Sequence, residues 1–486
     1  MKNWLEKIER VGNRLPHPVM LFVWLCALVM GLSALGSLLG WQITHPLSAK
    51  VVSAQSLLSQ NGLAFVLGSA IKNFVEFAPV GSVLVAMLGI GIAEKSGLLG
   101  CLLRAVVIAA PQKMLGFFVV LAGVLSSVAA DAGYVVLIPL AALLFKSAGR
   151  NPLIGLAAGF AGVSGGYSAN LLITPNDAIL AGITTEAIKL VQANGSITVT
   201  ANHFFKMASG IMIAGVGALV TAYLEKLYPV KTTATIQRLQ ADEKYALKNV
   251  GIFMLFALTL LLWLFLADNS PLQTPGKPLT QSTVFARSIV VLITVLAAIA
   301  GIVFGYSIKT FRRHHDVVLA AEEAMSTMGA YLVLMFFAAQ FVAYFNWSNL
   351  GIISSMAGAQ WLQQINWPPS ILVVVLILLV SLINLLIGSS SAAWALLAPV
   401  FVPMLMLVGI SPELTQAAYR IGDSATNIIT PLMPYFGIVV AFAQRHDSNA
   451  GIGTLMALML PFAMAFMASW IVLLMLWMAL DLPLGF

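Results

Sequence analysis

The sequence predicts an all-α polytopic membrane protein with nine transmembrane helices and two re-entrant helical hairpins, arranged in two inverted repeats with a broken helix at the centre of each. Of the 486 residues, 60% are hydrophobic and only 9% are charged, so a soluble globular protein of this size would lack charged surface. Apolar stretches of about 20 residues, the length that crosses a bilayer as a helix, recur along the chain. Such long apolar runs exclude the alternating pattern of a transmembrane β-barrel.

Nine stretches have the length and apolarity of transmembrane helices. These predicted spans are 17–40, 63–92, 153–183, 205–227, 249–268, 287–308, 318–345, 413–443 and 451–480. The N-terminal segment Met1–Leu15 is charged, and the apolar stretch after it is too long for a signal peptide, so we expect the first helix to be retained. Cys26 and Cys101 lie in or beside apolar segments and do not indicate a disulfide framework.

Two further apolar stretches, 114–146 and 369–408, are too long for one ordinary span. Small or polar residues interrupt both near the middle: Ser126, Ser127, Asp131 and Gly133 in the first, and Asn384, Gly388, Ser389, Ser390 and Ser391 in the second. An arm of about 15 residues rises only about 22 Å as a helix, so a turn at these points gives a hairpin that enters the membrane and returns. We therefore expect two re-entrant hairpins.

The basic residues predict that the N-terminus is cytoplasmic. With nine spans and a cytoplasmic start, most of the 25 lysines and arginines fall on the inner side, in agreement with the positive-inside rule. The first hairpin then opens to the cytoplasm and the second to the opposite side, so the two halves are inverted. The expected division is a first repeat at 1–227, a cytoplasmic linker at 228–248 and a second repeat at 249–486.

Short matches between the halves indicate an internal repeat. At a constant offset of 260 residues, the matches are Asp131–Tyr134 with Ser391–Trp394, Pro139 with Pro399, and Asn151–Pro152 with Ser411–Pro412. Further on, the same order of Ser, Asn, Thr and Pro occurs as Ser168, Asn170, Thr174 and Pro175, and again as Ser424, Asn427, Thr430 and Pro431. Each half is therefore predicted to contain a hairpin followed by a broken helix, at 153–183 or 413–443.

Pro175 and Pro431 are predicted to open these helices at membrane depth. A proline removes a backbone donor and clashes with a carbonyl one turn back, which leaves carbonyl groups unpaired. Hydroxyl and amide oxygens gather at the same points and are suitable ligands for a small alkali cation, bound once in each half. The candidate ligands are Ser168, Asn170, Thr174, Ser424, Thr426, Asn427 and Thr430. The alternative is that these side chains only join helices by hydrogen bonds.

Charged residues also lie near the predicted breaks and hairpin tips, namely Asp131, Asp177, Arg420 and Asp423. A charge at the bilayer centre costs at least about 2.5–3.5 kcal/mol, so each needs a partner or water. Arg420 and Asp423 are three residues apart on one predicted helix and can pair directly. They form either a structural ion pair or a transport site, in which the guanidinium binds a substrate carboxylate and the carboxylates carry protons or balance a cation.

Trp394 follows the tip of the second hairpin, where Tyr134 is its partner in the repeat. Its ring could stack on an aryl group of a substrate, and an ordinary packing role is an equal alternative. Pro412 stands at the start of the second broken helix, where proline commonly shapes the first turn.

At these residues the chain resembles the p-aminobenzoyl-glutamate transporter (AbgT) family, within the ion transporter superfamily that includes sodium–dicarboxylate carriers. The motifs that carry the resemblance are "ERVGNRLPHP" at 9–18, "GGYSANLLITPNDAILAGIT" at 165–184, "IGSSSAAWALLAPVFVPM" at 387–404 and "YRIGDSATNIITPLMPY" at 419–435. The likeness runs over essentially the whole chain. It implies a homodimer in the bacterial inner membrane, with nine spans and two hairpins in each protomer.

The resemblance also implies a function. Members of the family are secondary transporters that take up p-aminobenzoyl-glutamate, a folate breakdown product, or expel p-aminobenzoate and sulfonamide antimetabolites, driven by a proton or sodium gradient. The residues that the family ties to transport correspond here to Asp177, Ser391, Trp394, Pro412, Arg420 and Asp423. We accordingly expect a small aryl carboxylate as substrate, H⁺ or Na⁺ as coupling ion, no other cofactor and no nucleic-acid partner.

Three other functions compete with this interpretation. The segment "GVSG" at 162–165 matches the serine motif of rhomboid-type proteases, but all histidines fall at helix ends or in loops, so we expect no enzyme. Channels also contain re-entrant loops, yet inverted halves with a site at mid-depth favour alternating access. The remaining alternative is a sodium-coupled carrier of another organic anion.

Overall fold

A computed structural model describes residues 18–44, 51–108, 111–129, 133–229, 240–266, 270, 283–430, 433 and 435–486. The fold is helical, as the composition predicts. Within the described residues, the only strands are β1 (Gln42–Thr44) and β2 (Val51–Ser53), which pair antiparallel after the first helix.

The first half of the chain contains both long and short helices. The α-helices are α2 (Pro18–Leu38), α3 (Gln60–Gly68), α4 (Ala70–Val75), α5 (Ala78–Lys95), α6 (Leu98–Ile108), α7 (Leu115–Ser126), α8 (Ile138–Ser147), α9 (Pro152–Phe160), α10 (Pro175–Ile188) and α11 (His203–Leu227). Two 3₁₀ turns, η1 (Gln112–Met114) and η2 (Ser127–Ala129), flank α7. Two π-helical turns, η3 (Gly133–Leu137) and η4 (Ala161–Gly165), precede α8 and follow α9.

The second half of the chain also contains both long and short helices. Its helices are α12 (Ala241–Leu266), α13 (Thr283–Ser307), α14 (His314–Ser326), α15 (Gly329–Trp347), α16 (Leu350–Ile365), α17 (Pro369–Asn384), α18 (Ser390–Met406), α19 (Pro412–Asn427), α20 (Phe436–Gln444) and α21 (Ile452–Ala479).

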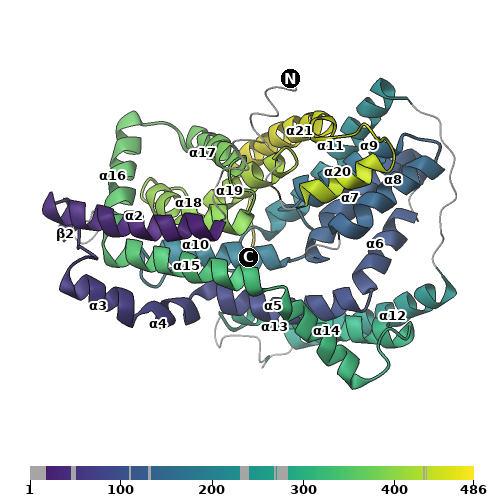
Figure 1. Cartoon of the computed structure of the whole chain (residues 1–486), viewed down its shortest axis with the longest axis horizontal. Coiled ribbons are helices and arrows are strands. Elements are labelled where there is room, and N and C mark those ends of the chain that lie inside the picture. Colours follow the sequence, from purple (N-terminus) through teal and green to yellow (C-terminus); the bar gives the residue numbers. More distant parts are fainter. Residues whose placement is uncertain are drawn as a thin grey trace.

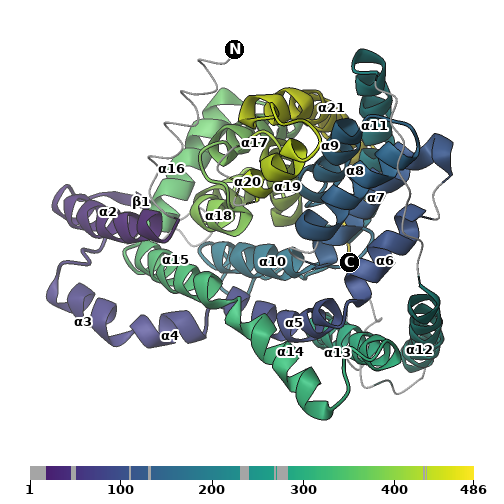
Figure 2. The same ribbon diagram turned by 45° about the vertical axis from the view of Figure 1, so that its right-hand side comes forward.

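The helices form a central body and an outer layer (Figures 1 and 2). In the central body, α8 packs against α9, α17 against α19, α10 against α18, and α11 against both α7 and α21. The outer layer includes α5, α12, α13 and α14, and α2, α3, α4 and α15 lie together at one end of the molecule (Figure 2). The largest cluster of buried apolar residues runs through the central body, where it joins the two predicted hairpins to both broken helices, and it extends to α2 and α15.

The stretches predicted as hairpins each consist of two helices. The prediction 114–146 corresponds to α7 and α8, and 369–408 to α17 and α18, with bounds within two residues of those predicted. Asp131, near the first tip, lies outside the described residues. The side from which each pair would enter a membrane stays a prediction.

Both predicted broken helices are interrupted, in a different way from that expected. In the first, the helical turns end at Gly165 and the chain is non-helical until Pro175, which is the first residue of α10. Thr174 precedes it in an extended conformation, so Pro175 begins a new helix rather than bending an old one, as its fixed φ favours. In the second, α19 ends at Asn427 and α20 begins at Phe436, and Pro431 lies outside the described residues.

Other elements differ from the prediction. The span 63–92 is divided into α3, α4 and α5, and Pro79, at the start of α5, lacks the N–H that a continuous helix would need. The span 318–345 is α14 and α15, which are bent by 46°. Two helices, α6 and α16, lie outside all of the predicted spans and hairpins.

The described residues contain five helices that are long and apolar enough to cross a membrane, namely α2, α11, α12, α13 and α21, and α14 with α15 makes a sixth if counted as one bent span. The other three predicted spans are those divided in the structure. The count of nine spans therefore stays a prediction.

A contact between glycines holds the first hairpin against the first broken helix. A Cβ atom on Gly162, in η4, would lie 2.4 Å from the carbonyl oxygen of Val120 and 3.0 Å from the Cα of Gly123, both in α7. A Cβ atom on Gly123 would lie 2.6 Å from the backbone of Gly162. Only glycine permits this approach of two backbones, which is a common way for helices to pack in membranes.

We expect the substitution Gly162→Ala to destabilise the protein, because the added methyl group would overlap the backbone of α7 and overpacking costs about 1–3 kcal/mol. Gly215→Ala is a matched control, since nothing lies within 4 Å of a Cβ at this position of α11. The control should be neutral or slightly stabilising. Thermal denaturation in detergent, followed by size-exclusion chromatography, compares the two. Equal midpoints would contradict the predicted contact.

Candidate functional site

A buried carboxylate, that of Asp177, is shared by cations from two other helices. Asp177 is the third residue of α10, and its Oδ2 accepts hydrogen bonds from the backbone N of Thr174 at 2.7 Å and from the Thr174 hydroxyl at 3.0 Å. The Nζ of Lys206, in the first turn of α11, donates to the same oxygen. The Nη2 of Arg420, on α19, lies 2.9 Å from Oδ1. The cluster therefore joins both halves of the chain.

The three charges are almost completely enclosed. Asp177 has no exposed surface, and Lys206 and Arg420 are each 3% exposed. One carboxylate and two cations leave a net positive charge, and its burial is tolerable only with further polar partners. Arg420 has two, because its Nε donates to Asn202 Oδ1 at 3.1 Å and its Nη2 to Gln416 Oε1 at 3.3 Å. A site with an excess of buried positive charge is suited to an organic anion.

The structural ion pair between Arg420 and Asp423, one of the two alternatives that their spacing allowed, is not formed, since no nitrogen–oxygen approach within 4 Å joins the two side chains. Arg420 extends instead toward α10, where Asp177 and the amides of Asn202 and Gln416 surround it. Spacing along one helix identifies local neighbours only, so it could not decide between the two alternatives. The long arginine side chain reached a better partner on another helix.

Asp423 is also fully buried, with fewer partners. Its Oδ1 lies 3.5 Å from the hydroxyl of Tyr419, which donates a shorter bond of 2.5 Å to the carbonyl of Ser390. Its Oδ2 has no hydrogen-bond partner among the described residues. A carboxyl group in this position needs a proton or a cation to offset the cost of burial.

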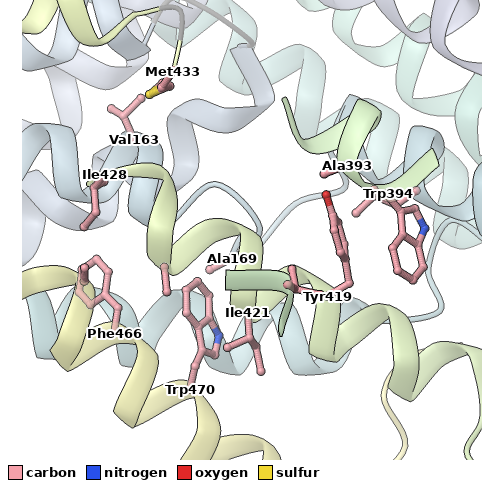
Figure 3. Close-up of a cluster of buried hydrophobic side chains, with 14 of the residues drawn as sticks. Val163, Ala169, Ala393, Trp394, Tyr419, Ile421, Ile428, Met433, Phe466 and Trp470 are labelled. Atoms are coloured by element: carbon pink, nitrogen blue, oxygen red, sulfur yellow. The ribbon is translucent and has the colours of Figure 1, made fainter. Parts of the chain in front are cut away.

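Trp394 is fully buried beside Tyr419, as Figure 3 shows. The two ring centroids are 4.4 Å apart with planes inclined by 32°. The indole N–H of Trp394 donates to the hydroxyl of Thr184, on α10, at 2.9 Å, and Gln416 donates to the same hydroxyl at 2.8 Å. Trp394 thus links α18 to α10 and α19, and Tyr419 covers the ring that could have met a substrate.

Pro412 is the first residue of α19, and the preceding Ser411 caps the helix by accepting from the backbone N of Leu414 at 3.2 Å. Its position agrees with a role in shaping the first turn.

The candidate cation ligands bond to one another and to the hairpins. In the first half, the side-chain amide of Asn170 donates to the carbonyl of Val124 at 2.9 Å and to the hydroxyl of Ser127 at 2.7 Å. In the second half, the amide of Asn384 donates to the hydroxyl of Thr426 and to the side chain of Asn427, each at 2.9 Å. Each break is therefore fastened to the hairpin of its own half.

The remaining candidate ligands join other elements. The backbone N of Ser168 donates to the hydroxyl of Ser424 at 3.1 Å, so residues that the repeat equates are in direct contact. Thr430 donates to the carbonyl of Leu385 at 3.2 Å, and Thr174 bonds Asp177. The oxygens of Ser168 and Asn384 are buried without a partner in the described part of the chain. The hydrogen-bonding alternative thus describes most of these side chains, and cation binding stays a prediction.

A cavity of about 260 Å³ lies where the two hairpin tips and the two breaks meet. The hairpins contribute Tyr134 and Ser389 to Ser391, and the breaks contribute Tyr167, Asn176, Asn427 and Tyr435. This volume is close to the lower end, about 300 Å³, of ordinary small-molecule sites. Of the six residues that the family resemblance ties to transport, Ser391 belongs to the described lining of the cavity. Asp177 is the neighbour of Asn176, and Asp423 is connected to the cavity wall through Tyr419 and Ser390.

A larger cavity, of about 380 Å³, lies between the C-terminal segment and the start of α19. Among the described residues that line it, those with charged side chains are Glu413 and Asp481. Two carboxylates would repel an organic anion, so the smaller central cavity is the better candidate site.

Residues 3–486 match the family model described as the AbgT putative transporter family. The chain belongs to this AbgT family. It is 33% identical over 482 residues to the "p-aminobenzoyl-glutamate transport protein" of Escherichia coli K12, with 98% of this chain and 95% of the relative covered.

Two solved structures of transporters resemble this AbgT family member. The YdaH transporter of Alcanivorax borkumensis, described as having an unusual topology, matches with a TM-score of 0.91 and 46% identity over 97% of this chain and 100% of that one. MtrF of Neisseria gonorrhoeae, described as illuminating a class of antimetabolite efflux pumps, matches with a TM-score of 0.90 and 43% identity over 98% and 97%. The helical fold and the membership of a transporter family, both predicted, are confirmed.

The protease alternative finds no support in this AbgT family member. Ser164, the serine of the "GVSG" segment, is fully buried and its hydroxyl lies 3.3 Å from the sulfur of Met433. The described residues also contain no group of three or more His, Cys, Asp or Glu that could hold a metal ion.

Sequence reasoning missed several residues of the site, above all Lys206, and with it Asn202, Thr184 and Tyr419. Lys206 had a usable signal, because a lysine inside the predicted span 205–227 is costly and implies a buried partner. Asn202 and Thr184 carried none, since both belong to common polar types near helix ends. Their roles depend on contacts between distant segments.

We expect Asp177→Asn to destabilise the protein strongly, because it leaves Lys206 and Arg420 buried without a counter-charge, and breaking such a pair costs about 3–5 kcal/mol. Adding Lys206→Met should restore part of the loss, because it removes one of the two cations. Thermal midpoints of the single and double variants, in a double-mutant cycle, measure the coupling. Strictly additive effects would show that the residues do not act as one cluster.

Proposed function

We propose that this AbgT family member is a secondary active transporter of p-aminobenzoyl-glutamate or related aryl carboxylates, and of sulfonamide antimetabolites. The observation that carries the proposal is the buried cluster at Asp177, where two cations from α11 and α19 share one carboxylate on α10. Asn176, the residue before Asp177, lines a cavity of about 260 Å³ between the halves, where a transporter built of inverted repeats would bind its substrate.

The names of the relatives support this substrate class. The Escherichia coli relative is a p-aminobenzoyl-glutamate transport protein, and MtrF is described in terms of antimetabolite efflux. Both kinds of molecule combine an aromatic ring with an acidic or sulfonyl group. We propose transport, by uptake or efflux, and no catalytic activity.

A gradient of protons or sodium ions would drive the transport. Asp177, Ser391, Trp394, Pro412, Arg420 and Asp423 are proposed as the transport residues. In this role Arg420 exchanges Asp177 for a substrate carboxylate, and Asp423, with one oxygen unpaired among the described residues, takes up a proton or faces a cation. The candidate sodium ligands remain Ser168, Asn170, Thr174, Ser424, Thr426, Asn427 and Thr430.

The membrane arrangement is proposed as nine spans and two re-entrant hairpins in inverted repeats, with the N-terminus in the cytoplasm. We place the protein in the bacterial inner membrane as a homodimer. Inverted halves that meet at one site are the usual basis of alternating access.

Purified protein in liposomes tests the proposal. Labelled p-aminobenzoyl-glutamate or a labelled sulfonamide is supplied under an imposed proton gradient, sodium gradient or neither. We expect saturable flux that depends on one of the two gradients, and its sign gives the direction. Equal flux with and without any gradient, without saturation, would indicate a channel and overturn the proposal.

Arg420→Ala and Trp394→Ala should each lower the transport rate by at least about tenfold. The first removes the cation proposed to bind the substrate carboxylate, and the second removes the hydrogen bond between α18 and α10. Matched controls are Arg445→Ala and Trp367→Ala, which alter exposed residues outside the central cavity. Only variants that elute as folded protein are compared. Wild-type rates in both variants would refute the assigned roles.

A further inference from the structure

We infer that Tyr134 and Tyr435 form the surface that binds the aromatic ring of the substrate, and that the side-chain amide of Asn176 donates to the carbonyl, carboxylate or sulfonyl group on that ring, in addition to the contact proposed between Arg420 and a substrate carboxylate. The inference rests on the proposed function and names the residues that would make the site select aromatic molecules. None of these three residues is among the six tied to transport by family resemblance.

Trp394, the aromatic residue first suggested by the sequence, already contacts other side chains of the protein in this structure. It is fully buried, the tilted ring of Tyr419 lies against its ring, and its N–H donates to the hydroxyl of Thr184. It is absent from the described lining of the central cavity. An incoming ring would have to displace Tyr419 to reach it, which would break a buried contact.

Tyr134, the repeat partner of Trp394, is placed differently. It lies in η3, lines the cavity and stacks on Tyr435, which precedes α20 and lines the cavity as well. Their ring centroids are 4.4 Å apart and their planes are inclined by only 12°. Two nearly parallel rings at the wall of a cavity provide a flat aromatic surface on which a further ring can stack or meet an edge.

Asn176 provides the polar contact. The residue is 4% exposed, it lines the cavity, and its Nδ2 has no hydrogen-bond partner among the described residues. A buried donor without an acceptor is unfavourable, and a ligand oxygen would satisfy it. Because a neutral amide N–H can donate either to a carboxylate or to a sulfonyl oxygen, one site could accept both substrate classes.

The surrounding backbone favours the same occupant. Asn176 is the second residue of α10, and Ser390 is the first residue of α18, so two helix N-termini reach the same cavity. The positive ends of both helix dipoles would stabilise a negatively charged or strongly polar group there. The expected ligand is therefore a single benzene ring carrying a carboxylate or sulfonamide group.

Equilibrium binding to the purified, detergent-solubilised protein tests the aromatic contact. The probes are p-aminobenzoate, p-aminobenzoyl-glutamate, sulfanilamide and, as a non-aromatic anion, glutamate. Tyr435→Leu and Tyr134→Leu should weaken binding of the three aromatic probes about five- to tenfold, and Tyr435→Phe, which keeps the ring, should bind as the wild type. The matched control is Phe65→Leu, which removes a ring stacked on Trp347 at 5.4 Å and 17° outside the lining of this cavity.

The amide contact has its own test. Asn176→Leu should weaken carboxylate and sulfonamide probes alike. Asn176→Asp should weaken p-aminobenzoate much more than neutral sulfanilamide, because it places a negative charge in the cavity. A purely structural role of Asn176 would change both affinities by the same factor, so the difference between the probes is decisive even if a tyrosine variant fails to fold.

The possible results separate the two proposals. The inference is wrong, while the proposed function stands, if folded Tyr435→Leu and Tyr134→Leu proteins bind the aromatic probes as tightly as the wild type. It is also wrong if Asn176→Asp changes the affinities for p-aminobenzoate and sulfanilamide by the same factor. If the wild type binds and transports none of the aromatic probes, the proposed function fails and the inference fails with it.

Discussion

The carboxylate of Asp177 is the point at which the two halves of the chain are held together electrostatically. It caps α10 through Thr174 and at the same time faces Lys206 from α11 and Arg420 from α19. Removing charges from water is costly, so a fully enclosed cluster of this kind is stable only while every member stays in place. The positions of α10, α11 and α19 are therefore interdependent, and the cavity beside Asn176 depends on all three.

The polar residues that join each helix break to its hairpin include the candidate ligands of a coupling ion. The amides of Asn170 and Asn384 fasten each break to its hairpin, and Ser168 bonds Ser424 across the two halves. Oxygen atoms that already share hydrogen bonds are preorganised around one place, which lowers the cost of collecting them around an ion. Structural and ligand roles are thus compatible for these side chains, and the two alternatives weighed from the sequence do not exclude each other.

The sequence predicted the fold class, the interruptions near Pro175 and after Asn427, and the residues Asp177 and Arg420, because each leaves a local signal: apolar length, a proline, or a charge in an apolar stretch. The sequence did not reveal which residues these side chains contact. Helical spacing allowed Arg420 to pair with Asp423, whereas the carboxylate that it contacts, that of Asp177, is about 240 residues away in the chain, and no periodic pattern encodes such a contact. The covering of Trp394 by Tyr419 was missed for the same reason. The three-part division of 63–92 did leave a local signal, Pro79, which the prediction did not use. The transport roles of the six residues named from the sequence stay predictions.

The glycine contact between α7 and η4 has a mechanical consequence. With backbone lying directly on backbone at Gly123 and Gly162, there are no side chains between the two segments that could change rotamer and let one slide past the other. The first hairpin and α9 must then shift as a rigid block. Any displacement of that block relative to α10 has to be absorbed by the non-helical stretch 166–174, which makes this short connection the natural hinge of the first half.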